Sequence, residues 1–212
     1  MDLTDEALIK KFKTTKDLNQ FKSLVRRYQN RLYNTAFRIL GNMEEAEEVV
    51  QDTFLRVHQN LDGFRDDARF ASWVFRITHN VCVDFVRMKQ RQKNGVKVMS
   101  FDPQSCFAED EHGAESAAVS LGQVADPHPD PAQKLALEEQ ERMIQQSLLE
   151  LPDNQREVLV LHDIEGFSYQ EIADIVGTSI GTVRSRLHYG RVKLRELLSS
   201  YLAGNEIPTA SR

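Results

Sequence analysis

Hydrophobic residues recur at steps of three and four over most of the chain, which is the pattern of helices that bury one face. The first such stripe covers residues 21–40, and Gly41 after it predicts the end of a helix. Asn42 and Glu45 have the spacing of a capping box, so they predict the start of a second helix, which ends at Gly63. Nowhere does the sequence show the alternation of a strand hairpin.

A third stripe begins near Phe70 and reaches Met88, and the last two turns of this predicted helix carry several basic residues. The helical pattern resumes at the Asp-Pro pair of residues 130–131, a capping residue followed by proline at the first helical position. It breaks at the Leu-Pro pair of residues 151–152, because proline cannot continue a helix.

Residues 100–131 separate these two helical parts and show no regular period. They hold four of the six prolines and seven acidic residues without one Lys or Arg. Such a composition buries too little apolar surface to offset the entropy of ordering. We therefore predict an all-α protein of two helical domains joined by a flexible acidic linker. The predicted boundaries are 1–95 for the first domain, 96–130 for the linker, 131–204 for the second domain and 205–212 for a tail.

The net charge of −5 over 212 residues argues, taken alone, against a polyanionic partner. The charge is unevenly distributed, however. Residues 64–99 hold eight basic against three acidic residues, and residues 177–212 hold six against two. Because a basic block rather than the total charge attracts phosphate, both segments are candidates for nucleic-acid contact. We hypothesise that the acidic linker and the acidic helices of residues 132–176 compete with DNA for these basic faces.

Composition and motifs exclude several classes of protein. Two cysteines are too few for a disulfide framework, and no stretch is long and apolar enough for a membrane span. The N-terminal sequence MDLTDEALIKKFKTT lacks the apolar core of a signal peptide, so we expect a cytoplasmic protein. Without a phosphate-binding loop or a zinc motif, we predict no enzyme activity, no catalytic residue, no cofactor and no metal site. Cys82 lies on an apolar helix face and is predicted to pack in the core, whereas Cys106 lies in the linker.

Residues 169–188 fit a helix-turn-helix. A capping box at Ser168 and Glu171 opens the first helix, and Ala173 is small where the two helices cross. Gly177 lies at the turn, where a positive φ is expected. Arginine and serine side chains recognise base edges or hold phosphates from a helix in the major groove. The polar residues on or near the outward faces of the second helix are Arg184, Ser185, Arg186, His188, Tyr189 and Arg191.

Three segments together resemble the sigma-70 family of bacterial RNA polymerase sigma factors, in particular the two-domain extracytoplasmic function group. Residues 44–64 resemble the helix that docks on the β′ coiled coil of the polymerase, and residues 69–91 resemble the segment that recognises and melts the −10 element. Residues 151–197 resemble the −35 recognition domain. The resemblance implies a region 2-like bundle, a region 4-like helix-turn-helix domain, and a protein that directs polymerase to promoters. The implied partners are core RNA polymerase, through its β′ coiled coil and β flap, promoter DNA and an anti-sigma factor, with no small-molecule substrate and no membrane insertion.

The site residues follow from this resemblance and from charge. Five acidic residues lie within nine positions, and Asp52 lies too far along the helix to serve its N-terminal dipole, so a basic protein partner is expected. The predicted polymerase-binding residues are Glu48, Gln51, Asp52 and Phe54. The predicted −10 residues are Phe64, Arg65, Arg76, Asn80, Arg87, Lys89 and Arg91. The predicted −35 residues are Arg184, Ser185, Arg186, His188, Tyr189, Arg191 and Lys193.

Several alternatives remain open. Phe64 either helps to capture an unstacked base or fixes its loop to the core. The acidic linker either enters a basic channel of the polymerase or is a plain tether. The family pattern commonly has arginine where Tyr189 stands and alanine where Gly190 stands. A dimeric helix-turn-helix regulator that works without polymerase, and an interaction protein that does not touch DNA, are the competing functions.

Overall fold

The computed structural model describes residues 3–64, 69–93 and 131–202, and these residues form helices and short connections. The predicted all-α class is therefore confirmed. The helices in chain order are α1 (Asp5–Thr15), α2 (Leu18–Leu40), α3 (Met43–Asn60), α4 (Phe70–Lys93), α5 (Pro131–Leu149), α6 (Asp153–Leu159), α7 (Tyr169–Val176) and α8 (Ile180–Leu202). A 3-10 turn, η1 (Leu61–Gly63), follows α3, and a π-helical turn, η2 (Val160–Ile164), follows α6.

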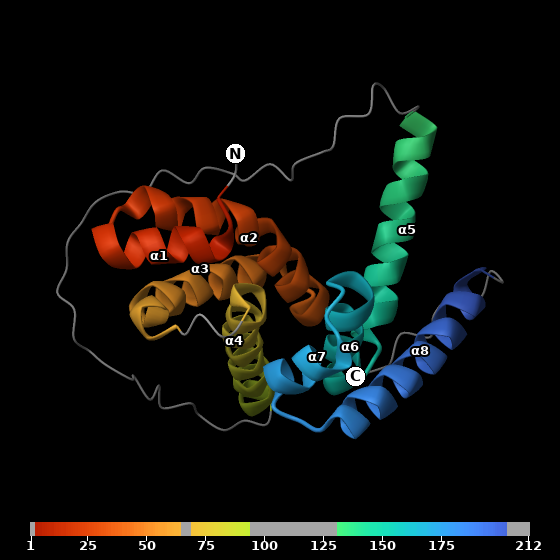
Figure 1. Cartoon of the computed structure of the whole chain (residues 1–212). Helices are drawn as coiled ribbons and strands as arrows, with labels where there is room; N and C mark the ends of the chain where they lie inside the picture. Colours follow the sequence, from red (N-terminus) through yellow and green to blue (C-terminus); the bar gives the residue numbers. More distant parts are fainter. Residues whose placement is uncertain (1–2, 65–68, 94–130, 203–212) are drawn as a thin grey trace.

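The N-terminal bundle consists of α1 to α4, with α2 packed against α1, α3 and α4 (Figure 1). Gly41 ends α2 at φ 75°, and the Asn42 side chain accepts a hydrogen bond from the Glu45 backbone N–H (3.0 Å), as the sequence predicts. Helix α1 precedes the first stripe found in the sequence. Its signal is the Thr4 hydroxyl, which accepts a hydrogen bond from the Ala7 backbone N–H (3.3 Å).

The C-terminal part contains the predicted helix-turn-helix, formed by α7 and α8. Ser168 and Glu171 make both bonds of the capping box at the start of α7. Gly177 ends that helix in the left-handed conformation at φ 68°, so the prediction for the turn is confirmed. In the interval before α7, helix α6 passes into the π-helical turn η2 before the chain turns at Gly166.

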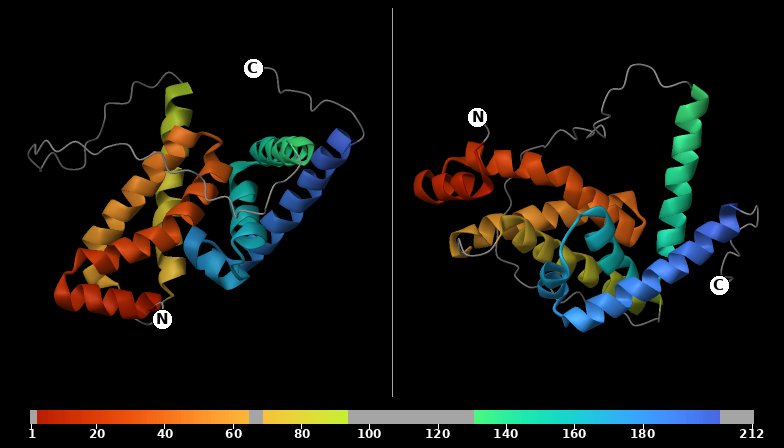
Figure 2. Two further views of the ribbon diagram at one scale, coloured as in Figure 1. Left: turned by 90° about the horizontal axis from the view of Figure 1, so that it is seen from above. Right: turned by 45° about the vertical axis from the view of Figure 1, so that its right-hand side comes forward.

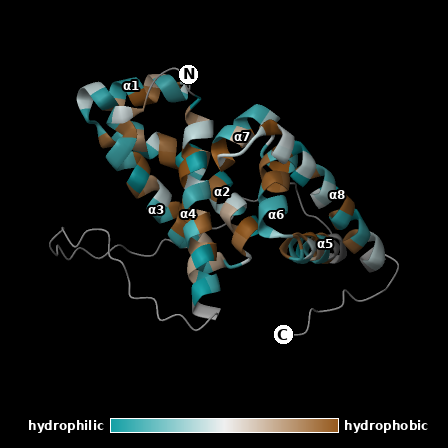
Figure 3. Ribbon diagram, turned by 90° about the horizontal axis from the view of Figure 1, so that it is seen from below, coloured by the Kyte–Doolittle hydropathy of each residue, from teal (hydrophilic) through white to brown (hydrophobic). Residues whose placement is uncertain are grey.

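The two helical parts pack against each other, with α6 and α7 lying on the side of the bundle formed by α2 and α4 (Figures 1 and 2). One buried hydrophobic cluster contains residues of both parts, among them Phe75 and Phe167. At Gly41, an added Cβ would lie 2.7 Å from Cδ1 of Leu149, so glycine permits the close approach of α5. The helices carry hydrophobic and hydrophilic stretches side by side, as expected for elements that bury one face (Figure 3).

Several predictions fall on residues outside the described ranges. They are the linker of residues 96–130 with Cys106, the loop residue Arg65, and the tail of residues 205–212. Among the helices that are described, none is both long enough and apolar enough to cross a bilayer.

Replacement of glycine by alanine is expected to change the stability of the protein in opposite directions at two positions. Gly190 lies inside α8, where an added Cβ would meet Gln155 and Leu159 at ordinary contact distances of 3.5–3.6 Å. We therefore expect Gly190→Ala to stabilise the protein by about 0.5–1 kcal/mol, because alanine favours a helix interior. At Gly177 the space is open but φ is positive, so Gly177→Ala should destabilise by about 1 kcal/mol.

Urea denaturation followed by circular dichroism measures both changes in the full chain. Equal shifts of the two midpoints in the same direction would contradict the assignment of these backbone conformations.

Candidate polymerase and nucleic-acid interfaces

The exposed side of α3 carries the predicted polymerase-binding residues. Glu48, Gln51 and Asp52 are exposed, whereas Phe54 is half-buried and meets the Phe21 ring edge-on at 6.4 Å. The exposed apolar group beside these carboxylates is instead Leu55, whose side chain is 60% exposed. The hydrophobic stripe of the sequence does not include Leu55, and its position one turn after exposed Asp52 is the signal that could have identified it.

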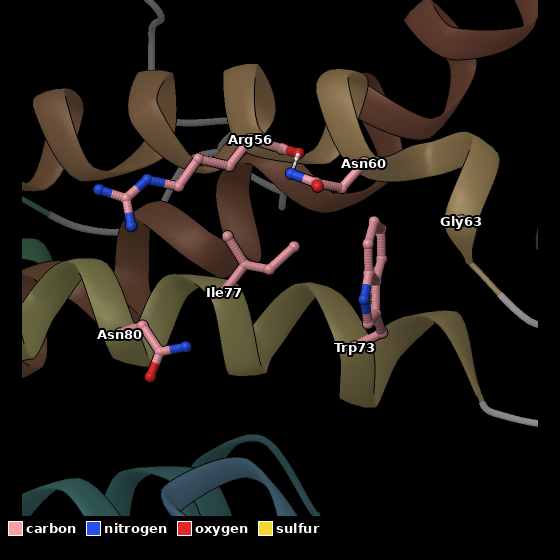
Figure 4. Close-up of a pocket in the computed structure, with 6 residues that line it drawn as sticks. All are labelled: Arg56, Asn60, Gly63, Trp73, Ile77 and Asn80. Carbon is pink, nitrogen blue, oxygen red and sulfur yellow. Dashed lines mark hydrogen bonds between the residues drawn. The ribbon is translucent and has the colours of Figure 1, made fainter. Parts of the chain in front are cut away.

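A pocket of about 370 Å³ opens between α3 and α4 (Figure 4). The Trp73 ring stands on α4 and faces the end of α3, and Asn80 lies two turns further along the same helix (Figure 4). Arg56 is held between two carboxylates, at 3.9 Å from each of Asp52 and Asp84. The residues that line the pocket are Arg56, Asn60, Gly63, Trp73, Ile77 and Asn80. Of these lining residues, only Asn80 is among the predicted −10 residues. Arg56 and Asn60 lie on α3, and they are identified as lining residues only by the packing of α3 against α4.

The prediction that the Phe64 side chain contacts DNA does not fit this structure. Phe64 is 5% exposed and packs against Phe70 and Trp73, with ring centroids 5.8 and 5.1 Å away. Its carbonyl oxygen accepts a hydrogen bond from Lys13 Nζ at 2.5 Å. Burial of this ring removes apolar surface from water, so Phe64 contributes to the core of the bundle.

The basic residues of α4 differ in their availability. Arg76, Arg87 and Arg91 are exposed. Lys89 is half-buried and lies with its Nζ 2.6 Å from Oε2 of Glu45, near the start of α3. The three arginines are therefore accessible to phosphates. Lys89 must first leave the Glu45 carboxylate in order to bind a phosphate.

The predicted −35 residues lie on one long helix, α8. Arg184, Ser185, His188, Tyr189 and Lys193 are exposed, and Arg186 is half-buried. Val183 and Leu187 are buried on the opposite side, against the rest of the C-terminal part. Since helical residues three and four apart share a face, the exposed residues form one surface.

Arg191 is already paired within the protein. Its guanidinium holds both carboxylate oxygens of Asp163, with Nε to Oδ2 at 3.0 Å and Nη2 against Oδ1. Hydrogen bonding to Asp163 raises the pKa of Arg191 above its ordinary value. The planar guanidinium is thus held in a fixed orientation at the edge of the α8 surface.

The thiol of Cys82 is not a reactive group in this structure. Its residue is 1% exposed and belongs to a second buried cluster with Val49 and Val81. Burial raises the pKa of the Cys82 thiol, which disfavours the nucleophilic thiolate. The prediction of a packed core cysteine is confirmed.

Comparison with known families identifies both helical parts of the chain. Residues 24–92 match the model of sigma-70 region 2, and residues 141–194 match the model of sigma-70 region 4. The chain is 34% identical over 182 residues to the ECF RNA polymerase sigma factor SigW of Bacillus subtilis (strain 168), covering 86% of this chain and 90% of SigW. It is also 34% identical to the sigma factor SigE of Mycolicibacterium smegmatis, over 84% of this chain and 61% of that protein. The chain therefore belongs to the extracytoplasmic function group of sigma-70 family sigma factors.

Two solved structures share the fold at 26% identity. CnrH, solved in complex with the cytosolic domain of CnrY, matches with a TM-score of 0.62 over 92% of this chain and 97% of CnrH. The sigma factor RpoE of Bartonella quintana, solved with the anti-sigma factor NepR, matches with a TM-score of 0.58 over 84% of this chain and 96% of RpoE.

Proposed function

We propose that this sigma factor joins core RNA polymerase through α3, opens the −10 element with α4 and recognises −35 duplex with α8. The observation that carries the proposal is that one chain presents an aromatic- and amide-lined pocket together with a separate exposed basic helix. An operator-binding dimer would need the basic helix alone. Covalent chemistry is left to the polymerase, with which the protein acts in the cytoplasm.

The α3 surface supports the polymerase contact. The exposed carboxylates of Glu48 and Asp52 lie about two turns and one turn before the exposed apolar side chain of Leu55 on α3. A basic protein surface with a small apolar recess complements this arrangement, because a central apolar anchor within a charged rim is typical of protein interfaces. The β′ coiled coil is the proposed partner of this face, and the β flap is the proposed partner of the C-terminal part.

The pocket between α3 and α4 supports strand opening. A base that leaves the stack loses stacking energy, and an aromatic ring with nearby hydrogen-bonding groups replaces part of it. Trp73 offers the edge of a ring at the pocket, and the Asn80 amide offers both a donor and an acceptor. Exposed Arg76 and Arg87 on the same helix are placed to hold the phosphates of that strand.

The α8 surface supports duplex recognition. We assign base contacts to Arg184 and Ser185, with His188 and Tyr189 beside them, and phosphate contacts to Arg186, Arg191 and Lys193. Asp163 holds the Arg191 guanidinium in place, which lowers the entropy lost when it binds phosphate.

An anti-sigma factor is the proposed regulator. The two structural neighbours named above were each solved with a bound protein, NepR and the cytosolic domain of CnrY, and the former is an anti-sigma factor. The exposed α3 face is a surface that such a partner has to cover in order to keep the chain from polymerase.

Reconstitution tests the proposed function. Purified protein and core polymerase together should start transcripts at defined promoters from a genomic DNA library, and neither component should do so alone. Specific duplex binding by the free protein, unchanged by core, would instead support the dimeric regulator.

The α8 assignment predicts two different losses. Arg184→Ala should reduce discrimination between the −35 sequence and its variants by about 1–3 kcal/mol, because one base contact is lost. Arg191→Ala should weaken binding to all sequences alike and lower the slope of log affinity against log salt by about 1. Holoenzyme binding to promoter duplexes at several salt concentrations measures both; identical effects of the two variants would contradict the division of roles.

The pocket assignment predicts the effect of a single amide. Asn80→Ala should weaken holoenzyme binding to a single-stranded −10 oligonucleotide by about 2–10-fold, as expected for one lost hydrogen bond. Gln59→Ala, at an exposed site of α3 outside the pocket, is the matched control and should leave the affinity unchanged. Affinity is measured by fluorescence anisotropy. If the wild type, Asn80→Ala and Gln59→Ala all bind with equal affinity, the unstacked base does not bind at Asn80.

A further inference from the structure

One face of α8 combines polar with apolar side chains. Residues three and four positions apart share a face of a helix, and four exposed residues of α8 have this spacing: Ser185, His188, Tyr189 and Val192. Tyr189 is 61% exposed and Val192 is 38% exposed. Because these two residues are one turn apart, they form a small exposed apolar surface on this face of the helix.

The opposite side of α8 fixes this orientation. Val183, Leu187 and Gly190 are buried, and an added Cβ at Gly190 would lie 3.5 Å from the backbone oxygen of Gln155 in α6. In both views of Figure 2, α8 lies at the edge of the C-terminal part, and no described helix lies along its outer side. The packing of α8 on α6 therefore turns Tyr189 away from the core.

The ring of Tyr189 is supported by its neighbour in the sequence. The rings of His188 and Tyr189 meet edge to face, with centroids 5.4 Å apart and planes at 71°. This contact restricts the rotation of the tyrosine side chain before any partner arrives. A side chain that is already ordered loses less entropy when it binds, so the ring is prepared for a contact.

The surroundings of the apolar surface are basic. Helix α8 contains five Lys and Arg residues and one acidic residue, Glu196, whose carboxylate lies 4.0 Å from Lys193 Nζ. Positive charge around a contact surface favours phosphate and disfavours a basic protein partner. The partner of the Tyr189 ring is therefore expected to be an apolar group that lies between phosphates, as a base edge does in the major groove of duplex DNA.

The major groove offers one apolar group of this kind. Base edges there present hydrogen-bond donors and acceptors, except that thymine also presents its C5-methyl group. A tyrosine ring and a valine side chain would leave the polar groups of other bases unpaired, whereas they complement a methyl group. Tyr189 follows Arg184 by five residues, which is about 7.5 Å along a helix. This distance corresponds to about two base pairs at ~3.4 Å each.

We propose that Tyr189, with Val192 beside it, is a specificity-determining residue that recognises the C5-methyl group of a thymine in the −35 element. This thymine lies about two base pairs from the pair that Arg184 contacts. The proposal rests on the −35 assignment of α8. The family pattern commonly has arginine at this position, so tyrosine exchanges a charged group for an uncharged one. Because a methyl contact releases no counterion, it adds base discrimination without adding salt dependence.

Deoxyuridine tests the proposal, because its base lacks only the C5-methyl group of thymine and keeps the same pairing with adenine. The probe is the promoter duplex that the reconstituted holoenzyme selects from the genomic library, with each −35 thymine replaced in turn. Wild-type holoenzyme should lose about fourfold in affinity at one position, as expected when one methyl group leaves an apolar contact. Holoenzyme with Tyr189→Ala should bind the thymine and deoxyuridine probes equally.

Two further variants are the controls. Tyr189→Phe keeps the ring and removes the hydroxyl, so it should keep the fourfold difference between the probes. Lys193→Ala removes a proposed phosphate contact, so it should weaken binding to both probes and also keep that difference. The slope of log affinity against log salt should fall by about 1 in Lys193→Ala and stay unchanged in Tyr189→Ala.

Several results would overturn the proposal. They are equal binding of both probes by the wild type at every −35 thymine, a selected −35 element without thymine, and a fourfold difference that persists in Tyr189→Ala or disappears in Tyr189→Phe. Weaker binding of Tyr189→Ala to core polymerase without DNA would assign the apolar surface to the polymerase instead. Specific promoter binding without a methyl effect would refute this proposal alone, whereas absence of promoter-specific complexes with the wild type would refute the proposed function as well.

Discussion

The contact between Phe75 and Phe167 brings together two helical parts whose aromatic residues are 92 positions apart in the chain, and the placement of every other surface depends on it. It sets α7 against α4 and thereby orients α8 relative to the pocket beside α3. The neighbouring ion pairs of Arg31 with Glu165 and of Arg69 with Glu171 add specificity more than strength, because partly exposed ion pairs contribute little each.

The packing of the two helical parts also accounts for the distribution of charge along the chain. The total of −5 conceals two basic segments, and the structure places most of their described basic residues on α4 and α8. Among the described acidic residues, one group lies on the outer face of α3, where a protein partner is proposed, and Glu165 and Glu171 of the C-terminal part contact the bundle. Separation of acid from base along the chain therefore serves both partner binding and the internal contact.

The elements whose signals are local were predictable from the sequence. The end of α2 at Gly41, the capping box at Ser168 and the turn at Gly177 depend on neighbouring residues, and each prediction is confirmed. The position of Phe64 was not decided by local pattern, because a ring in a loop either points outward or packs, and only the neighbouring Phe70 and Trp73 determine which. Contacts such as Glu165 with Arg31 join residues 134 positions apart, and periodicity carries no information about such pairs.

The separation of the two parts on a promoter is the quantity that tests this account most directly. Gln90 on α4 and Asn154 on α6 are exposed and border the same cavity of about 250 Å³ at the interface, so they are close together in the free protein. Spin labels at these two positions, in a Cys106→Ser background that leaves only buried Cys82, report their distance by pulsed electron resonance. We expect one short distance in the free protein and an increase of tens of ångströms in the holoenzyme bound to its promoter. The same short distance in both states would contradict the account.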